Sequence, residues 1–306
     1  MPVFELNQSD TSVPVLEFRH VALSFGDTEV LRDLSFKLHQ NELICLTGTA
    51  GTGKTVTLML AMGLLQPDEG QILIYGKEIE HLSEEELLAL RSRHLGITFQ
   101  EDALFTSLSV YENAAYRLVE QGWSEGAIRT AVSEIIAMVG LTDAMWKTPE
   151  ELSGGMKRRL EIARALVGWP SIMLFDEPTA GLDPVNAKNI LDLILQARDL
   201  HQTSAIFVSK ELHIIPYLAT HRAQHDPEQG EVQIVHARHD NLPNTHVLVL
   251  SEGVVSFWGT VEEFSASHAA SVLPLTHPEQ IPHEPEIYIP ITTQSVRKQT
   301  RDSENS

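Results

Sequence analysis

The sequence contains a single cysteine and no long apolar run. Cys45 stands alone within the apolar stretch "ELICLT", so no disulfide framework can form within the chain, and we expect a reducing compartment. No stretch approaches the roughly 18 consecutive apolar residues that a membrane-spanning helix needs. The first ten residues, "MPVFELNQSD", lack the basic start and the apolar core of a signal peptide. We therefore expect any work at a membrane to depend on a partner that carries the chain there.

Basic residues are also scarce. The 306 residues include 42 acidic and 22 basic side chains, which leaves a formal net charge of −20. Such a surface repels nucleic acid and anionic membranes, so we expect neither as the main partner. The 42% hydrophobic content is ordinary for a globular protein. The length allows one large domain or two small ones.

From about residue 15 to 265, short apolar runs alternate with helical patterns, which predicts an α/β fold. "VLEFRHVALSF" and "VLRDLSFKLH" predict paired strands around the turn "GDTE". "SIMLFDEP" and "SAIFVS" are typical of strands buried in a parallel sheet. Residues 1–14 form an N-terminal extension, and residues 266–306 form a proline-rich C-terminal extension. We expect its last dozen residues to be disordered.

The strongest motif is "GTAGTGKT", which begins at Gly48, follows a predicted strand and precedes a predicted helix. It fits the phosphate-loop pattern G-x-x-x-x-G-K-[ST]. Its glycines let several backbone N–H groups face one anion, and the helix start adds positive potential. We expect Lys54 to reach the β- and γ-phosphates of ATP and Thr55 to hold Mg²⁺. The residues expected to bind the nucleotide here are Gly48, Thr49, Ala50, Gly51, Thr52, Gly53, Lys54, Thr55 and Val56.

A second motif, "IMLFDEPTAGLD", ends a predicted strand in two acids. The strand delivers Asp176 to its C-terminal end, where ligands bind in open α/β sheets. We expect Asp176 to hold Mg²⁺ and Glu177 to polarise an attacking water. Two acids after an apolar run are common by themselves, but together with a phosphate loop they indicate nucleotide hydrolysis.

A third motif, "ELSGGMKRRLEIARAL", opens a predicted helix with Ser153, Gly154 and Gly155. The N–H groups of a helix start, and a hydroxyl beside them, suit an anion. A plain helix N-cap is the alternative. Two phosphate-binding helix starts so distant in sequence make sense if one chain supplies the loop and another supplies Ser153 to the same ATP.

The order "GTAGTGKT", Gln100, "LSGGM", "LFDEP" and "AGLD" resembles an ABC-transporter ATPase subunit over about residues 15–265. The resemblance implies a P-loop NTPase fold with a RecA-like core, a small antiparallel β-subdomain and a helical subdomain at about 100–165. It also implies a homodimer that binds MgATP at two shared sites and drives integral-membrane permease subunits from the cytoplasmic face of the membrane.

The resemblance further implies roles for individual residues. Phe25 resembles the aromatic residue that stacks on adenine. Gln100 resembles the glutamine that contacts Mg²⁺ in the catalytic site and links it to the permease. Residues 153–155 would cap the γ-phosphate of the partner subunit's ATP, and Asp183 would lie at the dimer seam.

The segment "LGITFQEDALFTSLSVYENAAYRL", the methionine of "LSGGM" and the valine of "GKTV" are similar to ATPases of the Mce/Mla type. This resemblance implies phospholipid or a related lipid as the cargo and an Mce-type lipid-binding protein as a further partner. For the apolar residues of 104–118, core packing is the alternative interpretation. A non-transport ABC protein of translation or DNA repair is a second alternative, which the single ATPase unit, the lack of a long heptad run and the charge of −20 disfavour.

The stretch "VSKEL" departs from the family pattern, because Lys210 stands where a histidine usually contacts the γ-phosphate. Three hypotheses follow. Lys210 makes this contact as a point charge, without the tunable proton of an imidazole; or the contact is lost and the subunit binds ATP but hydrolyses it slowly; or His213, about 4.5 Å further along a helix, replaces it. We favour the first, because the other expected catalytic residues are present: Glu177, Lys54, Asp176 and Gln100.

The polar segment 221–245 interrupts the family pattern and is rich in histidine. His221 and His225, at i and i+4, could share a helix face and bind zinc, as could His236 and His239. We favour a solvated loop with a β-hairpin in "EVQIVHARH". A partner-docking or regulatory surface is the third interpretation.

Overall fold

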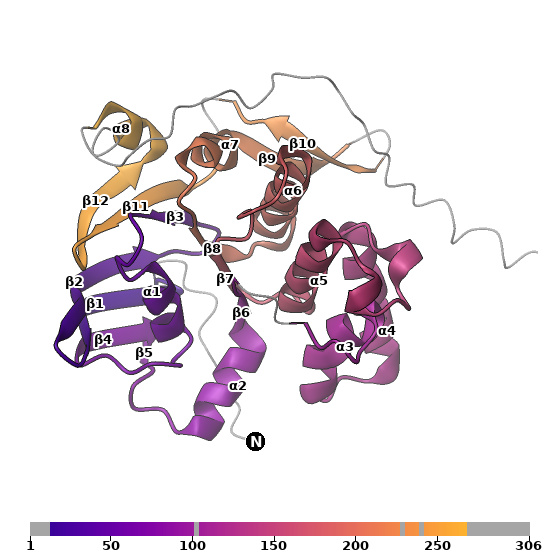
Figure 1. The fold of residues 1–306 in the computed structure, drawn as a ribbon, viewed down its shortest axis with the longest axis horizontal. Helices are drawn as coiled ribbons and strands as arrows, with labels where there is room; N and C mark the ends of the chain where they lie inside the picture. Colours follow the sequence, from indigo (N-terminus) through magenta and orange to yellow (C-terminus); the bar gives the residue numbers. More distant parts are fainter. Residues whose placement is uncertain (1–12, 101–103, 227–229, 239–241, 268–306) are drawn as a thin grey trace, which may run out of the picture.

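The computed structural model describes residues 13–100, 104–226, 230–238 and 242–267. One ten-stranded sheet runs through this part of the chain in the order β5-β4-β1-β2-β12-β11-β3-β8-β7-β6, with helices on both sides of it (Figure 1). The expected α/β fold is confirmed. The sheet is built from β1 Leu16–Phe25, β2 Thr28–Leu38, β3 Leu43–Thr47, β4 Glu69–Ile74, β5 Lys77–Glu78, β6 Leu95–Thr98, β7 Ile172–Asp176, β8 Ser204–Val208, β11 Thr245–Ser251 and β12 Val254–Thr260.

The parallel half of the sheet, β11-β3-β8-β7-β6, is covered on both faces. Alternate residues of β3 show this: Leu43 and Cys45 join the apolar cluster that contains α6, while Ile44 and Leu46 join the one that contains α1 and α2. Burial on both faces explains why these strands are continuous apolar runs. Burial also raises the pKa of Cys45 to about 12, which leaves its thiol protonated in the core. The helices of this half are α1 Lys54–Ala61, α2 Glu84–His94, α6 Pro184–His201, α7 Ile215–Thr220 and α8 Val261–Ala266.

The antiparallel half is built around the predicted hairpin. β1 and β2 pair from Leu16↔Leu38 to Phe25↔Thr28, and β4 pairs with the other edge of β1. β12 joins β2 through Val254↔Asp33 and so connects the two halves into one sheet. The paired strands expected around "GDTE" are thereby confirmed.

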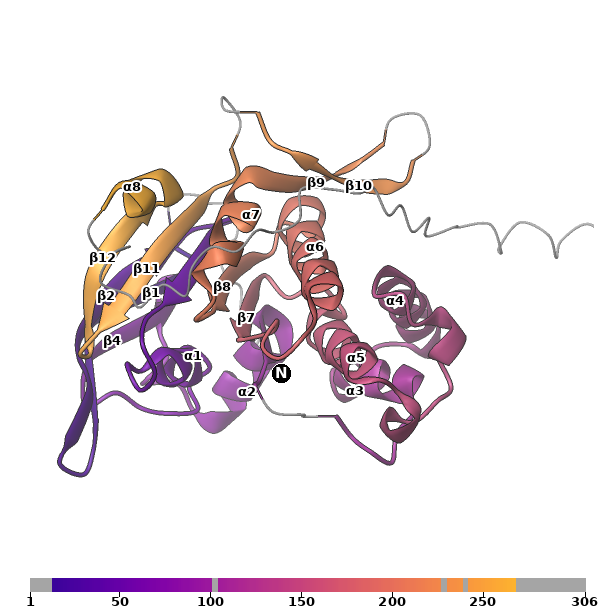
Figure 2. The same ribbon diagram turned by 45° about the horizontal axis from the view of Figure 1, so that its top comes forward.

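Three helices form a lobe beside the sheet: α3 Val110–Glu120, α4 Glu125–Met138 and α5 Gly154–Leu166 (Figures 1 and 2), and α5 packs against β6. The segment leading into α3 is fixed by Asn113, which is fully buried. Its Nδ2 donates to the carbonyls of Phe105, Leu108 and Ser109 at 3.0, 2.9 and 3.0 Å, and its Oδ1 accepts from the Phe105 N–H at 2.9 Å. One amide therefore replaces the hydrogen bonds that this irregular segment lacks.

The polar segment forms a hairpin with a different partner from the one we expected. β10, Val232–His236, pairs with β9, His221–His225, so the second strand precedes "EVQIVHARH" rather than lying within it. β9 is held on α6 by a buried pair, since Arg198 Nη2 donates to the His221 carbonyl at 2.8 Å and Asp199 Oδ2 accepts from the Ala223 N–H at 2.7 Å. Figure 2 shows the hairpin lying across the end of α6.

The zinc hypothesis for His221 and His225 is wrong, because it required a helix and both residues lie in β9. Four residues of strand separate their Cα atoms by about 13 Å, too far for one metal ion. Within the described part of the segment no three histidine, cysteine or acidic side chains are placed to hold a metal. His239, the partner proposed for His236, lies outside the described residues, as do residues 1–12 and 268–306 of the two extensions. No helix in the described ranges combines the length and apolar character needed to cross a membrane.

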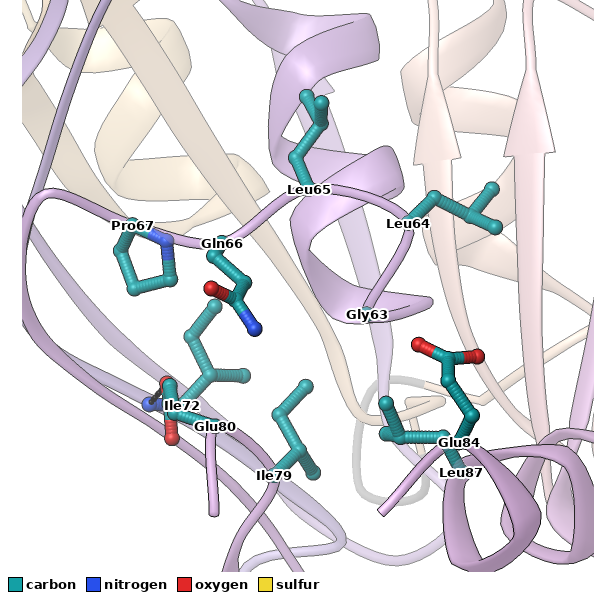
Figure 3. A pocket seen from close by; sticks show the side chains of 10 residues that line it. All are labelled: Gly63, Leu64, Leu65, Gln66, Pro67, Ile72, Ile79, Glu80, Glu84 and Leu87. Atoms are coloured by element: carbon teal, nitrogen blue, oxygen red, sulfur yellow. Dashed lines mark hydrogen bonds between the residues drawn. The ribbon is translucent and has the colours of Figure 1, made fainter. Parts of the chain in front are cut away.

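A cavity of about 250 Å³ lies between the end of α1, the start of α2 and the β4–β5 strands (Figure 3). Its lining combines apolar side chains with three polar ones, those of Gln66, Glu80 and Glu84. Glu80 Oε1 accepts the Ile72 N–H at 2.5 Å, while no described group donates to its buried Oε2. Burial raises the pKa of this carboxyl. The cavity shares no lining residue with the phosphate loop.

Replacing Glu80 with glutamine should stabilise the protein in a pH-dependent way. Because the pKa of Glu80 is raised on folding, its ionised form disfavours the folded state at high pH, and this cost disappears as the pH falls through the raised pKa. We expect Glu80→Gln to raise the melting temperature by roughly 2–4 °C at pH 8 and by less at pH 5. Glu84→Gln is the control, since the Glu84 side chain is 87% exposed. A melting temperature that falls at pH 8 would contradict this.

Candidate functional site

The phosphate loop curls at glycines that no other residue could replace without strain. Gly48 has φ 148°, and a Cβ there would lie 2.3 Å from the carbonyl oxygen of Leu250. Gly53, the N-cap of α1, has φ 95°, and a Cβ there would lie 2.8 Å from Leu31 Cδ2. The left-handed backbone and the close packing both require glycine. The loop is thereby pressed between β11 and β2, with α1 starting at Lys54.

Lys54 is held over this loop. Its Nζ donates to the carbonyls of Gly48 and Thr49 at 2.8 and 2.7 Å, and the residue is only 5% exposed. Burial, followed by the nearby charge of Lys210, lowers the pKa of the Lys54 ammonium. A phosphate bound in the loop would offset both effects, because it supplies opposite charge and hydrogen-bond acceptors.

Thr55 and Asp176 meet although 121 residues separate them in sequence. Thr55 Oγ1 donates to Asp176 Oδ2 at 2.9 Å. The other oxygen, Asp176 Oδ1, is buried, and no donor in the described part of the chain reaches it. Burial, the largest cause, raises the pKa of Asp176. A hydroxyl and a carboxylate oxygen that lacks a donor suit a hard cation such as Mg²⁺, so the residues present fit the expected ion.

Glu177 follows Asp176 in an unusual backbone conformation. Its φ is 47°, in the left-handed region that residues other than glycine rarely adopt. Its N–H donates to the Val208 carbonyl at 3.1 Å. Lys210 Nζ lies 2.6 Å from Glu177 Oε1; the Lys210 side chain is 47% exposed and that of Glu177 11%. The ends of neighbouring strands β7 and β8 thus bring these two residues together.

The segment that carries Lys210 is anchored by Ser209. The Ser209 N–H donates to the Leu46 carbonyl at 3.1 Å, and its Oγ accepts from the Glu211 N–H at 2.9 Å. His213 is exposed in the short helix Leu212–Ile214, and no contact with Glu177 or Asp176 places it at the site. Of the two candidates for the missing histidine, Lys210 is therefore the one beside Glu177.

Two further predicted residues lie at or just after the ends of strands. Phe25 is half exposed at the end of β1, where it pairs with Thr28. Gln100 is exposed after β6; its carbonyl accepts from Arg158 Nη2 at 3.0 Å, and no hydrogen bond within the described residues joins its side chain to Asp176 or Glu177.

Ser153 caps the first turn of α5, and its Oγ accepts from the Met156 N–H at 3.3 Å. Ser153 and Gly154 are exposed, and no described contact joins them to the phosphate loop of the same chain. The structure thus gathers the loop, Asp176, Glu177 and Lys210 at one place and leaves the start of α5 apart from them.

Two residues near the site were missed at the level of sequence. Arg158 Nη1 donates to the Phe99 carbonyl at 2.9 Å and to Glu161 at 2.7 Å, so it fixes the segment before Gln100 on α5. Asn186 lies against Gly155. Asn186 comes three residues after Asp183, the N-cap of α6, and this spacing is the signal that could have indicated it.

The protein-family model described as "ABC transporter" matches residues 31–180. "Protein TRIGALACTOSYLDIACYLGLYCEROL 3, chloroplastic" from Arabidopsis thaliana is 38% identical over 270 residues, which cover 85% of this chain and 72% of that protein. "Intermembrane phospholipid transport system ATP-binding protein MlaF" from Haemophilus influenzae is 35% identical over 206 residues, or 67% and 78% of the two chains.

Similarity extends to a protein named for another cargo and to a solved dimer. "Methionine import ATP-binding protein MetN" from Leifsonia xyli is 36% identical over 207 residues, or 67% of this chain and 61% of that protein. A dimeric structure of the ATP-binding cassette MJ0796, bound to ADP and Pi, matches with a TM-score of 0.66 at 23% identity, over 80% of this chain and 98% of that one. At this identity the likeness concerns the fold alone.

Proposed function

Since the chain belongs to the ABC transporter family as an ATP-binding subunit, we propose that the transporter it energises moves phospholipid or a related lipid in an Mce-type system. The chain is an ABC ATPase, and ATP-binding cassettes dimerise and work with permease subunits. The alternative of a non-transport ABC protein is therefore set aside. We also propose that the subunit forms a homodimer at the cytoplasmic face of the membrane and that a lipid-binding protein is a further partner.

The names of two relatives carry the cargo proposal: a relative that matches 85% of this chain is named for a galactolipid, and another is named for phospholipid transport. The residues that follow Gln100 also support a lipid cargo, because they resemble ATPases of the Mce/Mla type. Identity alone does not decide the cargo, since a protein named for methionine import is 36% identical.

We further propose how the residues share the reaction. Phosphoryl transfer depends mainly on positioning and on stabilising charge. Lys54 and the loop N–H groups hold the phosphates, while Thr55 and Asp176 would hold Mg²⁺, which supplies positive charge against the phosphate oxygens. Glu177 orients the attacking water, and Lys210 keeps Glu177 in place and donates to the γ-phosphate. The start of α5 from the partner subunit closes over the same ATP with Ser153, Gly154 and Gly155. Phe25 of the first subunit stacks on the adenine, and its Gln100 would contact the Mg²⁺.

The cargo proposal is tested on the ATPase assembled with its permease subunits in vesicles. We expect ATP-dependent movement of a fluorescent phosphatidylglycerol out of the labelled vesicles, and ATP hydrolysis stimulated by phospholipid but not by methionine. Vesicles assembled with Glu177→Gln are the control and should show no ATP-dependent movement. Stimulation by methionine, with no movement of lipid in the presence of ATP, would refute a lipid cargo while leaving the ATPase assignment intact.

A further inference from the structure

Two adjacent glycines at the start of α5 have different surroundings. A Cβ on Gly155 would lie 2.7 Å from Asn186 Oδ1 and 2.9 Å from Asn186 Cγ, closer than real Cβ atoms approach. A Cβ on Gly154 would meet nothing within 4 Å. Gly154 therefore faces open space, whereas Gly155 is pressed against the Asn186 amide of the same chain.

The Asn186 amide is itself held in one orientation by Asp183. Asp183 Oδ2 accepts from Asn186 Nδ2 at 2.6 Å, and Oδ1 accepts from the N–H groups of Val185 and Asn186, both at 3.1 Å. The carboxylate thus caps α6 and fixes a side chain on its first turn. Replacing Asn186 with a smaller residue would remove the side-chain atoms that pack against Gly155 from α6.

Asp183 belongs to the same short segment as Glu177. Between them, the Ala180 N–H donates to the Glu177 carbonyl at 3.1 Å, and the Leu182 N–H donates to the Thr179 carbonyl at 3.2 Å. Two turn hydrogen bonds, the short backbone between them and the Asp183–Asn186 hydrogen bonds therefore connect Glu177 to the side chain that packs against Gly155. Such a connected set of contacts can transmit a displacement from one end to the other.

We propose that Asn186 is a positioning residue that joins the Glu177–Asp183 segment to the start of α5, so that the two segments move as one unit. This inference rests on the proposed function, in which Glu177 serves the subunit's own ATP and Ser153–Gly155 serve the partner's. Asn186 then links the two nucleotide sites of the dimer through the interior of each subunit.

The test is a double-mutant cycle on ATP hydrolysis by the assembled transporter. Gly155→Ala should lower kcat about 100-fold, because its Cβ displaces the start of α5 from Asn186. Asn186→Ala should lower kcat about tenfold, and it removes the amide that a Cβ on residue 155 would meet. Adding Gly155→Ala to Asn186→Ala should therefore lower kcat by less than about twofold more. Gly154→Ala is the matched control, and its loss should persist in full in the Asn186→Ala background.

Two measurements distinguish a positioning role of Asn186 from a loss of nucleotide binding or of folding. Asn186→Asp keeps the size of the side chain but removes the Nδ2 donor and sets a second carboxylate beside Asp183. It should lower kcat about tenfold, while the affinity of the isolated subunit for a fluorescent ATP analogue stays within about twofold. Melting temperatures of the variants identify any that fail to fold.

The outcomes are distinct. The proposal is overturned if Gly155→Ala costs the same factor with and without Asn186, or if Asn186→Ala and Asn186→Asp hydrolyse ATP like the wild type. If Ser153→Ala and Gly154→Ala both hydrolyse ATP like the wild type, the role of these residues in the proposed function fails, and the link between sites fails with it.

Discussion

Glu177→Gln should reduce ATP hydrolysis by the assembled transporter at least about 100-fold, the usual contribution of a positioned base. The substitution keeps the size of the side chain but removes the charge that orients the attacking water and that Lys210 faces at 2.6 Å. Steady-state phosphate release measures the loss. ATP binding should persist, because Lys54 and the loop are unchanged, and ATP should stabilise a dimer of the variant during gel filtration.

The matched control for Glu177→Gln is Glu211→Gln, which changes an exposed acid after the neighbouring strand. We expect this variant to hydrolyse ATP within about twofold of the wild type, as is usual for surface substitutions. A Glu177→Gln protein that retained more than a tenth of the wild-type rate would show that another group orients the water.

Lys210→Met should lower hydrolysis about tenfold or more, since it keeps an unbranched side chain of nearly the same length but removes one charged donor from the site. The structure gives a reason beyond the phosphate contact: Lys210 forms an ion pair with Glu177, and about half of its side chain remains exposed and able to turn toward a bound nucleotide. Lys210→Ala should lose as much. Lys210→His should stay within a few-fold of the wild type, because histidine restores the residue that the family usually has.

A different result would contradict this role of Lys210: the wild type barely hydrolyses ATP in the assembled transporter, and Lys210→His accelerates hydrolysis. The ion pair would then restrain Glu177, and the subunit would work mainly by binding ATP and closing. This is the poorly hydrolysing alternative that the sequence left open, and it would refute the proposed role of Lys210.

Residue spacing alone was enough to predict the parts of the protein that are encoded over short stretches. The phosphate loop, the strand ending in Asp176 and the N-cap of α5 are each encoded within about a dozen residues, where apolar runs, glycines and caps act locally. The α/β class and the paired strands around "GDTE" followed for the same reason. The start of α2 is also set locally, because Ser83 and Glu86 form a capping box there.

Which distant residues meet could not be predicted from spacing, because it depends on how the elements pack. The Thr55–Asp176 bond, the Lys210–Glu177 pair and the contact of Asn186 with Gly155 each join different elements, and their distances follow from sheet order and helix packing. The hairpin shows the same limit. "EVQIVHARH" predicted a hairpin of its own, but it contributes one strand, whose partner is His221–His225, held on α6 by the buried Arg198–Asp199 pair. Pairing of this kind depends on such anchors, and residue spacing alone does not reveal them.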